Sequence, residues 1–165
     1  MPPTSTTTPS PTTDTPLTAP LRVAVVGAGN RSTRYATYAL RHPDRMRIVA
    51  VADPNTERAR TLAAAHGLGA EACFASYQQL AEHPDIADAV INGTMDQLHT
   101  ESTIRLLEAG FEVLLEKPIA PTEPEVRRIH ETAEKHRRLV MVCHVLRYAP
   151  FYQQVALLKT SVQRA

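Results

Sequence analysis

The segment GAGNRS occupies positions 27–32, between an apolar run and an amphipathic segment. Gly27 permits a tight turn, and Gly29 lets a pyrophosphate approach the backbone. The unpaired N–H groups at the start of the following helix attract such an anion. Ser32 replaces the third glycine of the G-x-G-x-x-G pattern, where a small side chain still allows a helix to pack closely on a strand. The spacing predicts a dinucleotide-binding loop, with a plain glycine turn as the alternative.

An acidic residue, Asp53, follows the second apolar run, 24 positions after Gly29. This separation is close to the roughly 20 positions expected for the carboxylate that hydrogen-bonds the adenosine ribose hydroxyls of NAD. A carboxylate there disfavours the 2′-phosphate of NADP, so we expect NAD to be the preferred cofactor. Arg58, one helical turn further on, offers partial compensation and keeps NADP open as the alternative.

Two polar loops follow the fourth and fifth apolar runs. The first covers positions 94–99, and the second begins with Glu116, Lys117 and Pro118. A lysine at the carboxyl end of a strand, beside a nicotinamide, can hydrogen-bond a substrate hydroxyl and help to manage its proton as hydride leaves. The alternative interpretation is that Glu116 and Lys117 form an ordinary surface ion pair.

The elements that must position these residues alternate between short apolar runs and amphipathic segments. We expect strands at residues 21–26, 48–52, 72–75, 87–92, 112–115 and 139–143, with the third the weakest. The first helix should turn Ser32, Tyr35, Ala36, Ala39 and Leu40 inward. The pattern predicts an α/β protein: a Rossmann-type, doubly wound parallel sheet of about six strands in the order 3-2-1-4-5-6, with helices on both faces. Its ligand crevice should lie beyond strands one and four.

Composition excludes several classes of partner. Lys and Arg total 18 against 17 for Asp and Glu, so no net charge draws the chain to nucleic acid or an anionic membrane. Cys73 and Cys143 lack metal-ligand or redox spacing, so we expect no metal and two buried thiols. Residues 1–20 are rich in Thr and Pro and lack the features of a signal sequence, which predicts a disordered tail on a cytoplasmic protein without a membrane span.

The E-K-P segment at 116–118, with the run 109–115 before it, resembles a signature of the Gfo/Idh/MocA oxidoreductases. The glycine loop, positions 51–55, positions 96–99 and positions 143–152 extend the resemblance in the order found in that family. It implies an NAD(P)-binding domain that helps to oxidise or reduce a hydroxyl or carbonyl, often of a sugar or polyol. It also implies that Lys117 is the active-site lysine.

The resemblance further implies which residues surround the cofactor. Gly27, Gly29, Asn30, Arg31 and Ser32 would line the pyrophosphate and Asp53 the ribose, while Thr94, His99, Glu116, Lys117, His144 and Arg147 would line the rest of the cleft. For His144 and Arg147 a purely structural role is an equal alternative.

Three segments are expected: a disordered tail at 1–20, the NAD(P)-binding domain at 21–143, and at 144–165 a connecting helix with the truncated start of a substrate domain. Tyr148, Phe151, Tyr152, Val155 and Leu158 should form one apolar helix face, available for self-association. With a substrate domain supplied, the partner would be a small molecule. The alternatives are a non-catalytic dinucleotide-binding module, a relic that has lost the cofactor, and a relative that cleaves glycosidic bonds by transient oxidation with NAD.

Overall fold

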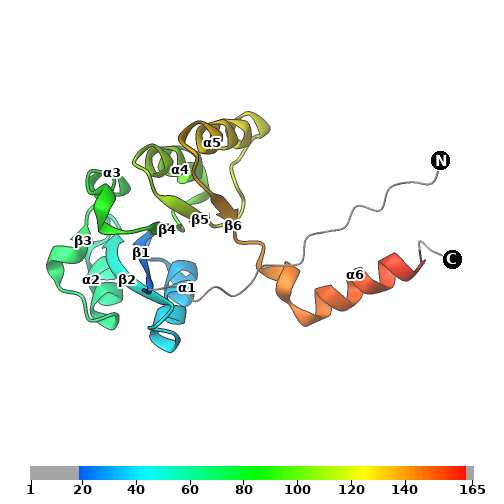
Figure 1. The fold of residues 1–165 in the computed structure, drawn as a ribbon, viewed down its shortest axis with the longest axis horizontal. Helices are drawn as coiled ribbons and strands as arrows, with labels where there is room; N and C mark the ends of the chain where they lie inside the picture. Colours follow the sequence, from blue (N-terminus) through cyan, green and yellow to red (C-terminus); the bar gives the residue numbers. More distant parts are fainter. Residues whose placement is uncertain (1–18, 163–165) are drawn as a thin grey trace.

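Six parallel strands form a single sheet in the order β3-β2-β1-β4-β5-β6 (Figure 1). The structure is a computed structural model that describes residues 19–162, with side chains described as far as residue 156. The strands are β1 (Leu21–Val26), β2 (Met46–Ala52), β3 (Cys73–Phe74), β4 (Ala89–Asn92), β5 (Glu112–Leu115) and β6 (Val140–Val142). The predicted fold class and strand order are confirmed.

Helices connect the strands and cover both faces of the sheet. They are α1 (Asn30–Arg41), α2 (Thr56–Ala65), α3 (Tyr77–Leu80), α4 (His99–Glu108), α5 (Glu123–His136) and α6 (Pro150–Val162). Single-turn 3-10 helices add η1 (Ala70–Ala72), η2 (Pro84–Ile86), η3 (Asp96–Leu98) and η4 (Val145–Tyr148).

Two apolar clusters form the core, one on each face of the sheet. Because side chains alternate along a strand, Val23 and Val25 of β1 face α1 and α2, whereas Ala24 and Val26 face α3, α4 and α5. Residues of β1 and β4 are buried on both faces, as expected for central strands of a parallel sheet.

The first helix packs through a narrower face than the sequence pattern predicts. Ser32, Ala36 and Ala39 are buried, whereas Leu40 is 55% exposed and Tyr35 is half-buried. The prediction that Leu40 points inward is therefore wrong. A helix turns about 100° per residue, so once Ala39 faces the sheet its neighbour Leu40 points well away from it.

The predicted third strand is shortened to two residues. It lies at the edge of the sheet, where it pairs only with the last residues of β2, Val51 with Cys73 and Ala52 with Phe74. Cys143 is buried as predicted, but Cys73 is only half-buried, in keeping with its place on an edge strand. Among the described residues, no group of His, Cys, Asp and Glu side chains is placed to hold a metal ion.

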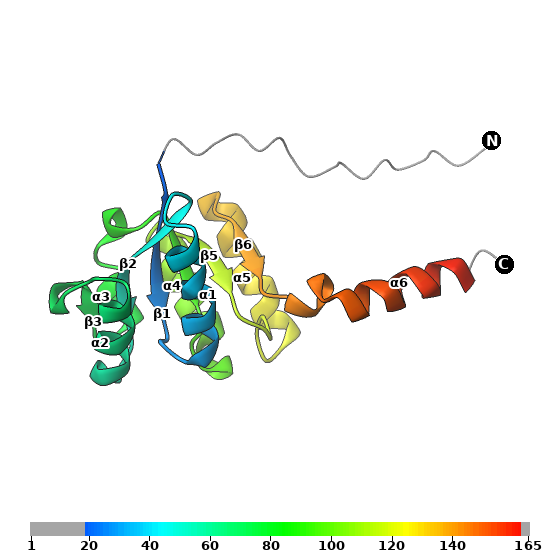
Figure 2. The ribbon, with the colours of Figure 1, turned by 90° about the horizontal axis from the view of Figure 1, so that it is seen from below.

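Beyond β6, the chain leaves the sheet through η4, and α6 extends away from it in two perpendicular views (Figures 1 and 2). Tyr148, Phe151, Tyr152 and Val155 are exposed, consistent with an unpaired apolar surface. Leu158, the last residue of the predicted apolar face, lies outside the described side chains. Most of the predicted tail, residues 1–18, also lies outside the described residues. Within residues 19–162, none of the helices combines the length and the apolar character that a membrane span requires.

Candidate dinucleotide-binding site

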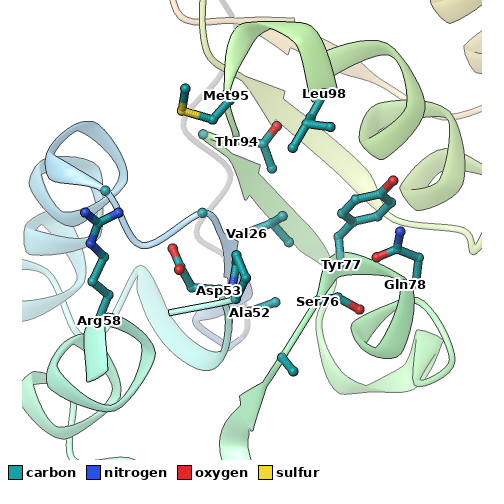
Figure 3. A pocket seen from close by; sticks show the side chains of 15 residues that line it. Val26, Ala52, Asp53, Arg58, Ser76, Tyr77, Gln78, Thr94, Met95 and Leu98 are labelled. Carbon is teal, nitrogen blue, oxygen red and sulfur yellow. The ribbon is translucent and has the colours of Figure 1, made fainter. Parts of the chain in front are cut away.

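A cavity of about 420 Å³ lies beyond the carboxyl ends of β1, β2 and β4 (Figure 3). The glycine loop contributes Gly27 and Gly29, and the segment after β2 contributes Asp53 and Arg58. The remaining wall comes from α3 and the loop after β4, through side chains that include Ser76, Tyr77, Thr94, Met95 and Leu98. The cavity occupies the position where strand order reverses, which is the crevice that the sequence predicts.

The two loop glycines serve different purposes. Gly27 has a φ of +79°, and a Cβ atom added to it would lie 2.5 Å from the carbonyl oxygen of Gly93, so the loop after β1 presses against the loop after β4. Gly29 has open space: a Cβ atom there would meet nothing within 4 Å. Gly29 precedes α1 and has no side chain to cap its first N–H groups. The site therefore offers an anion both room and donors.

The carboxylate of Asp53 is buried at the end of β2, with 6% of the residue exposed. One oxygen, Oδ2, accepts a hydrogen bond from the backbone N–H of Ala28 at 2.7 Å, and Oδ1 accepts one from the N–H of Asn55, also at 2.7 Å. A carboxylate oxygen can accept more than one hydrogen bond, so Asp53 keeps capacity for ligand hydroxyls. Arg58 lines the same cavity from α2 and is exposed.

The other residues predicted to line the pyrophosphate lie differently from the glycines. Ser32 is buried, its Oγ has no hydrogen-bond partner, and a Cβ atom on Gly93 would lie 2.2 Å from that oxygen. This is the close packing expected of a small residue in the third glycine position. Asn30 is exposed and accepts a hydrogen bond from Arg34. The Arg31 Nε lies 3.8 Å from Glu116 Oε1.

The loop after β4 is held by Asn92, a residue that the sequence analysis did not single out. Its buried amide donates to Ser102 Oγ at 2.8 Å and to Thr103 Oγ1 at 3.0 Å, and its Oδ1 accepts from Thr94 Oγ1 at 3.0 Å. The sequence feature that could have identified Asn92 is its position as the polar last residue of an otherwise apolar strand. The amide fixes Thr94 at the cavity wall.

His99 joins the loop after β4 to the loop after β5. Its ring is buried, with Nδ1 2.6 Å from the carbonyl oxygen of Pro118 and Nε2 3.1 Å from that of Thr94. Both neighbours are carbonyl oxygens, which accept hydrogen bonds from a ring N–H group. His99 therefore supports the two loops rather than forming the cavity wall.

A buried acidic group stands next to Lys117. Glu116 is 5% exposed; Tyr35 donates its hydroxyl to Oε1 at 2.6 Å, and the backbone N–H of Lys117 donates to Oε2 at 2.6 Å. Glu116 is thus not half of an exposed ion pair, and the side chain of Lys117 is exposed. Burial raises the pKa of the Tyr35 hydroxyl, and its hydrogen bond to Glu116 adds to the rise. Burial likewise raises the pKa of the nearby Cys143 thiol.

His144 and Arg147 follow β6, where the chain leaves the sheet. Both are exposed, and their described hydrogen bonds are made by backbone groups: His144 N–H donates to Val142, and Arg147 N–H donates to His144.

Of the residues that the sequence predicts for the site, the structure gathers Gly27, Gly29, Asp53 and Thr94 around the cavity. It joins Arg31 to Glu116 in a second cluster next to Lys117. It leaves His144 and Arg147 apart from the cavity wall.

This fold, with a glycine loop, an acid after β2 and a cavity where strand order reverses, defines a dinucleotide-binding Rossmann domain. Residues 21–144 match the family model described as "Oxidoreductase family, NAD-binding Rossmann fold". The chain belongs to this family, the Gfo/Idh/MocA oxidoreductases, and the resemblance found in the sequence is confirmed.

Relatives of known name share this part of the chain. Inositol 2-dehydrogenase 4 from Saccharopolyspora erythraea is 35% identical over 138 residues, which are 82% of this chain and 39% of the relative. D-glucoside 3-dehydrogenase from Escherichia coli K12 is 32% identical over 138 residues, 83% of this chain and 38% of the relative. The chain thus spans about two fifths of the length of these curated relatives.

Solved structures show the same fold. A 3-ketoreductase from Actinomadura kijaniata, in complex with NADP and TDP-benzene, matches with a TM-score of 0.74 and 30% identity, over 86% of this chain and 42% of that protein. The WlbA dehydrogenase from Bordetella pertussis, in complex with NADH and UDP-GlcNAcA, matches with a TM-score of 0.69 and 27% identity, over 80% of this chain and 37% of that protein.

Proposed function

We propose that this chain forms the cofactor-binding part of an NAD-dependent oxidoreductase that transfers hydride to or from a hydroxyl or carbonyl carbon of a sugar-like or polyol-like small molecule. The observation that carries the proposal is the cavity, which brings Gly29, Asp53 and Thr94 to one edge of the sheet. Its members match the parts of a dinucleotide: open space and helix N–H groups for the pyrophosphate, and a carboxylate for the ribose. The names of the relatives support the class of substrate.

NAD is the proposed cofactor in preference to NADP. The Asp53 carboxylate lines the cavity and would accept hydrogen bonds from the ribose hydroxyls, whereas a 2′-phosphate would meet its negative charge. Arg58 is the one arginine that lines the same cavity of the described chain, and it would reduce this repulsion. The preference for NAD over NADP is therefore proposed to depend on the balance between the charges of Asp53 and Arg58.

Lys117 is the proposed catalytic residue. The nicotinamide of a bound cofactor supplies or accepts the hydride. The ammonium group of Lys117 would hydrogen-bond the substrate oxygen and hold or release its proton while the bond to hydrogen at the neighbouring carbon changes. The support is the position of Lys117 at the end of β5, where its side chain is exposed while Glu116 holds its backbone.

The region after β6 is proposed to connect the cofactor domain, residues 21–143, to substrate-binding structure. Its exposed aromatic rings, on Tyr148, Phe151 and Tyr152, are also proposed to allow self-association. The non-catalytic module remains the second candidate, favoured by the same unpaired apolar surface, which suits a chain that works through a partner.

A titration of the 165-residue chain with NADH and NADPH, followed by NADH fluorescence and thermal shift, tests the central proposal. Saturable binding with NADH tighter than NADPH is the expected result, whereas a folded chain that binds neither would contradict it. Turnover of polyols or nucleotide sugars with NAD would separate the enzyme from the non-catalytic module. Retained NAD without net change in its redox state during cleavage of a glycoside would instead indicate the glycosidase-type relative.

A further inference from the structure

The short segment that carries Lys117 is held from both sides by side chains of distant helices. On one side, Tyr35 of α1 donates to Glu116, a partner 81 positions away in the sequence. On the other side, His99 of α4 lies 2.6 Å from the carbonyl oxygen of Pro118. Lys117 stands between these two attachments, and its own backbone N–H is bonded to Glu116.

The attachment through Glu116 has the features of a strong one. The carboxylate is 5% exposed, both of its oxygens accept hydrogen bonds at 2.6 Å, and Oε1 lies 3.8 Å from Nε of Arg31. Hydrogen bonds to an ionised acceptor are shorter and stronger than those between neutral groups. A buried carboxylate that loses a hydrogen-bond partner also carries an uncompensated desolvation cost. The Glu116 side chain is therefore restricted to the position in which both hydrogen bonds are made.

We propose that Tyr35 is a positioning residue for Lys117: its hydroxyl fixes the Glu116 carboxylate, which in turn fixes the backbone of Lys117, while His99 braces the same segment through Pro118. The proposal rests on the function assigned to Lys117 above. It assigns a role to a helix residue that is otherwise a half-buried member of the α1 face. The lysine side chain itself stays exposed and free to reach a substrate.

Hydrogen exchange of single backbone amides, measured by NMR on the 165-residue chain without cofactor, tests the attachment. Tyr35→Phe removes one oxygen atom and should accelerate exchange of the Lys117 amide by about threefold to tenfold, the factor that corresponds to losing one hydrogen bond. Amides of β4 and β5 should keep their rates, since a local release leaves the sheet intact. Glu116→Gln, which weakens both hydrogen bonds, should have the same effect and provides a second variant.

Tyr38→Phe is the matched control, because Tyr38 lies on the same helix with 39% of its surface exposed and stacks on His42. It should leave exchange at Lys117 unchanged. Unchanged exchange at Lys117 in both Tyr35→Phe and Glu116→Gln would overturn the proposal, as would equal acceleration of all amides, which would show only a general loss of stability.

Amine labelling tests the consequence for the lysine side chain. The chain has three lysines, at 117, 135 and 159, and Lys135 is exposed on α5, so it serves as the internal reference. Bound NADH should slow labelling of Lys117 relative to Lys135 in the wild-type chain. At equal NADH occupancy, this protection should fall by about threefold in Tyr35→Phe, in line with one lost hydrogen bond, and not in Tyr38→Phe.

The two measurements separate the possible failures. Bound NADH that gives no protection of Lys117 in the wild-type chain would contradict the place given to Lys117 in the proposed function. Protection that is present in the wild type and equally strong in Tyr35→Phe would contradict the role of Tyr35 alone.

Discussion

The carboxylate of Asp53 accepts a hydrogen bond of 2.7 Å from the backbone N–H of Ala28, and so ties the end of β2 to the glycine loop after β1. Its second oxygen holds the N–H of Asn55, at the start of the loop into α2. The acid proposed to bind the ribose therefore also shapes the loop proposed to bind the pyrophosphate. A substitution at Asp53 should accordingly change cofactor binding both through the lost contact with the ribose and through the altered glycine loop.

Replacing Asp53 with serine should weaken NADH more than NADPH. The shorter hydroxyl loses the ribose hydrogen bonds, which to a charged group are worth about 1.5–3 kcal/mol each, or roughly tenfold to a hundredfold in Kd. For NADPH, losing the repulsion between the carboxylate and the 2′-phosphate should offset the effect of a less ordered glycine loop. Titrations by NADH fluorescence and by thermal shift measure both constants, and equal losses for the two cofactors would contradict the assignment.

Arg58→Ala is the matched test at a second charged residue of the same cavity. If Arg58 receives a 2′-phosphate, this variant should weaken NADPH by about twofold to fivefold, as for an exposed charge pair, and leave NADH unchanged. A loss for NADH of the same size would place Arg58 at a different part of the cofactor.

The two loop glycines should respond differently to substitution by valine. Gly29→Val should weaken NADH and NADPH alike while the thermal midpoint stays close to that of the wild type, because the added side chain enters open space. Gly27→Val should destabilise the fold by about 1–3 kcal/mol or more, because φ is +79° and its Cβ would lie 2.5 Å from a carbonyl oxygen. Binding and thermal denaturation, measured on both, check the pair. Undiminished binding by Gly29→Val would show that the glycine loop is not the site.

Alkaline pH should destabilise the fold through the cluster beside Glu116. Burial raises the pKa of both Tyr35 and Cys143. In the unfolded chain these groups lose their protons near about pH 10 and about pH 8.5, whereas the folded chain keeps them. The free energy of unfolding should therefore be highest below about pH 8.5 and fall as pH rises from there.

Urea denaturation at a series of pH values measures this dependence. A double variant, Tyr35→Phe with Cys143→Ala, should show a shallower fall between about pH 8 and pH 10.5, and Tyr38→Phe should keep the wild-type slope. Identical slopes in the wild type and the double variant would exclude the cluster as the source.

Self-association through α6 should depend on its exposed rings. Phe151 is 72% exposed, and Phe151→Ser should weaken a dimer by about tenfold or more, since burying such a side chain is worth roughly 1.5–3 kcal/mol. Gln153→Ala, at another exposed position of the same helix, is the control. Sedimentation equilibrium gives the dissociation constants, and a chain that is monomeric at all concentrations would contradict the proposal.

The sheet, its strand order and the position of the cavity could all be predicted from the amino-acid sequence. Each of these depends on local patterns: an apolar run such as that of β1, the helical spacing of Ala36 and Ala39, and the spacing of the glycines between the first strand and its helix. Asp53 could be found in the same way, because its place after β2 is a matter of spacing. Strand ends were less certain, as β3 shows, because an edge strand extends only as far as its neighbour pairs with it.

The side chains that support the site could be identified only from the packing of the folded chain. Tyr35 meets Glu116, His99 meets Pro118, and Ser32 packs against Gly93, yet no pattern in the sequence connects these partners. Each pair joins elements that are brought together by packing on the sheet, and helix rotation decides which side chain faces the partner. The same rotation leaves Leu40 in solvent and turns Tyr35 toward the lysine segment. Local periodicity predicts the inward face of a helix to within about one residue, or about 100° of rotation about the helix axis. A hydrogen bond depends on that rotation much more closely, because it tolerates only a narrow range of distances and angles.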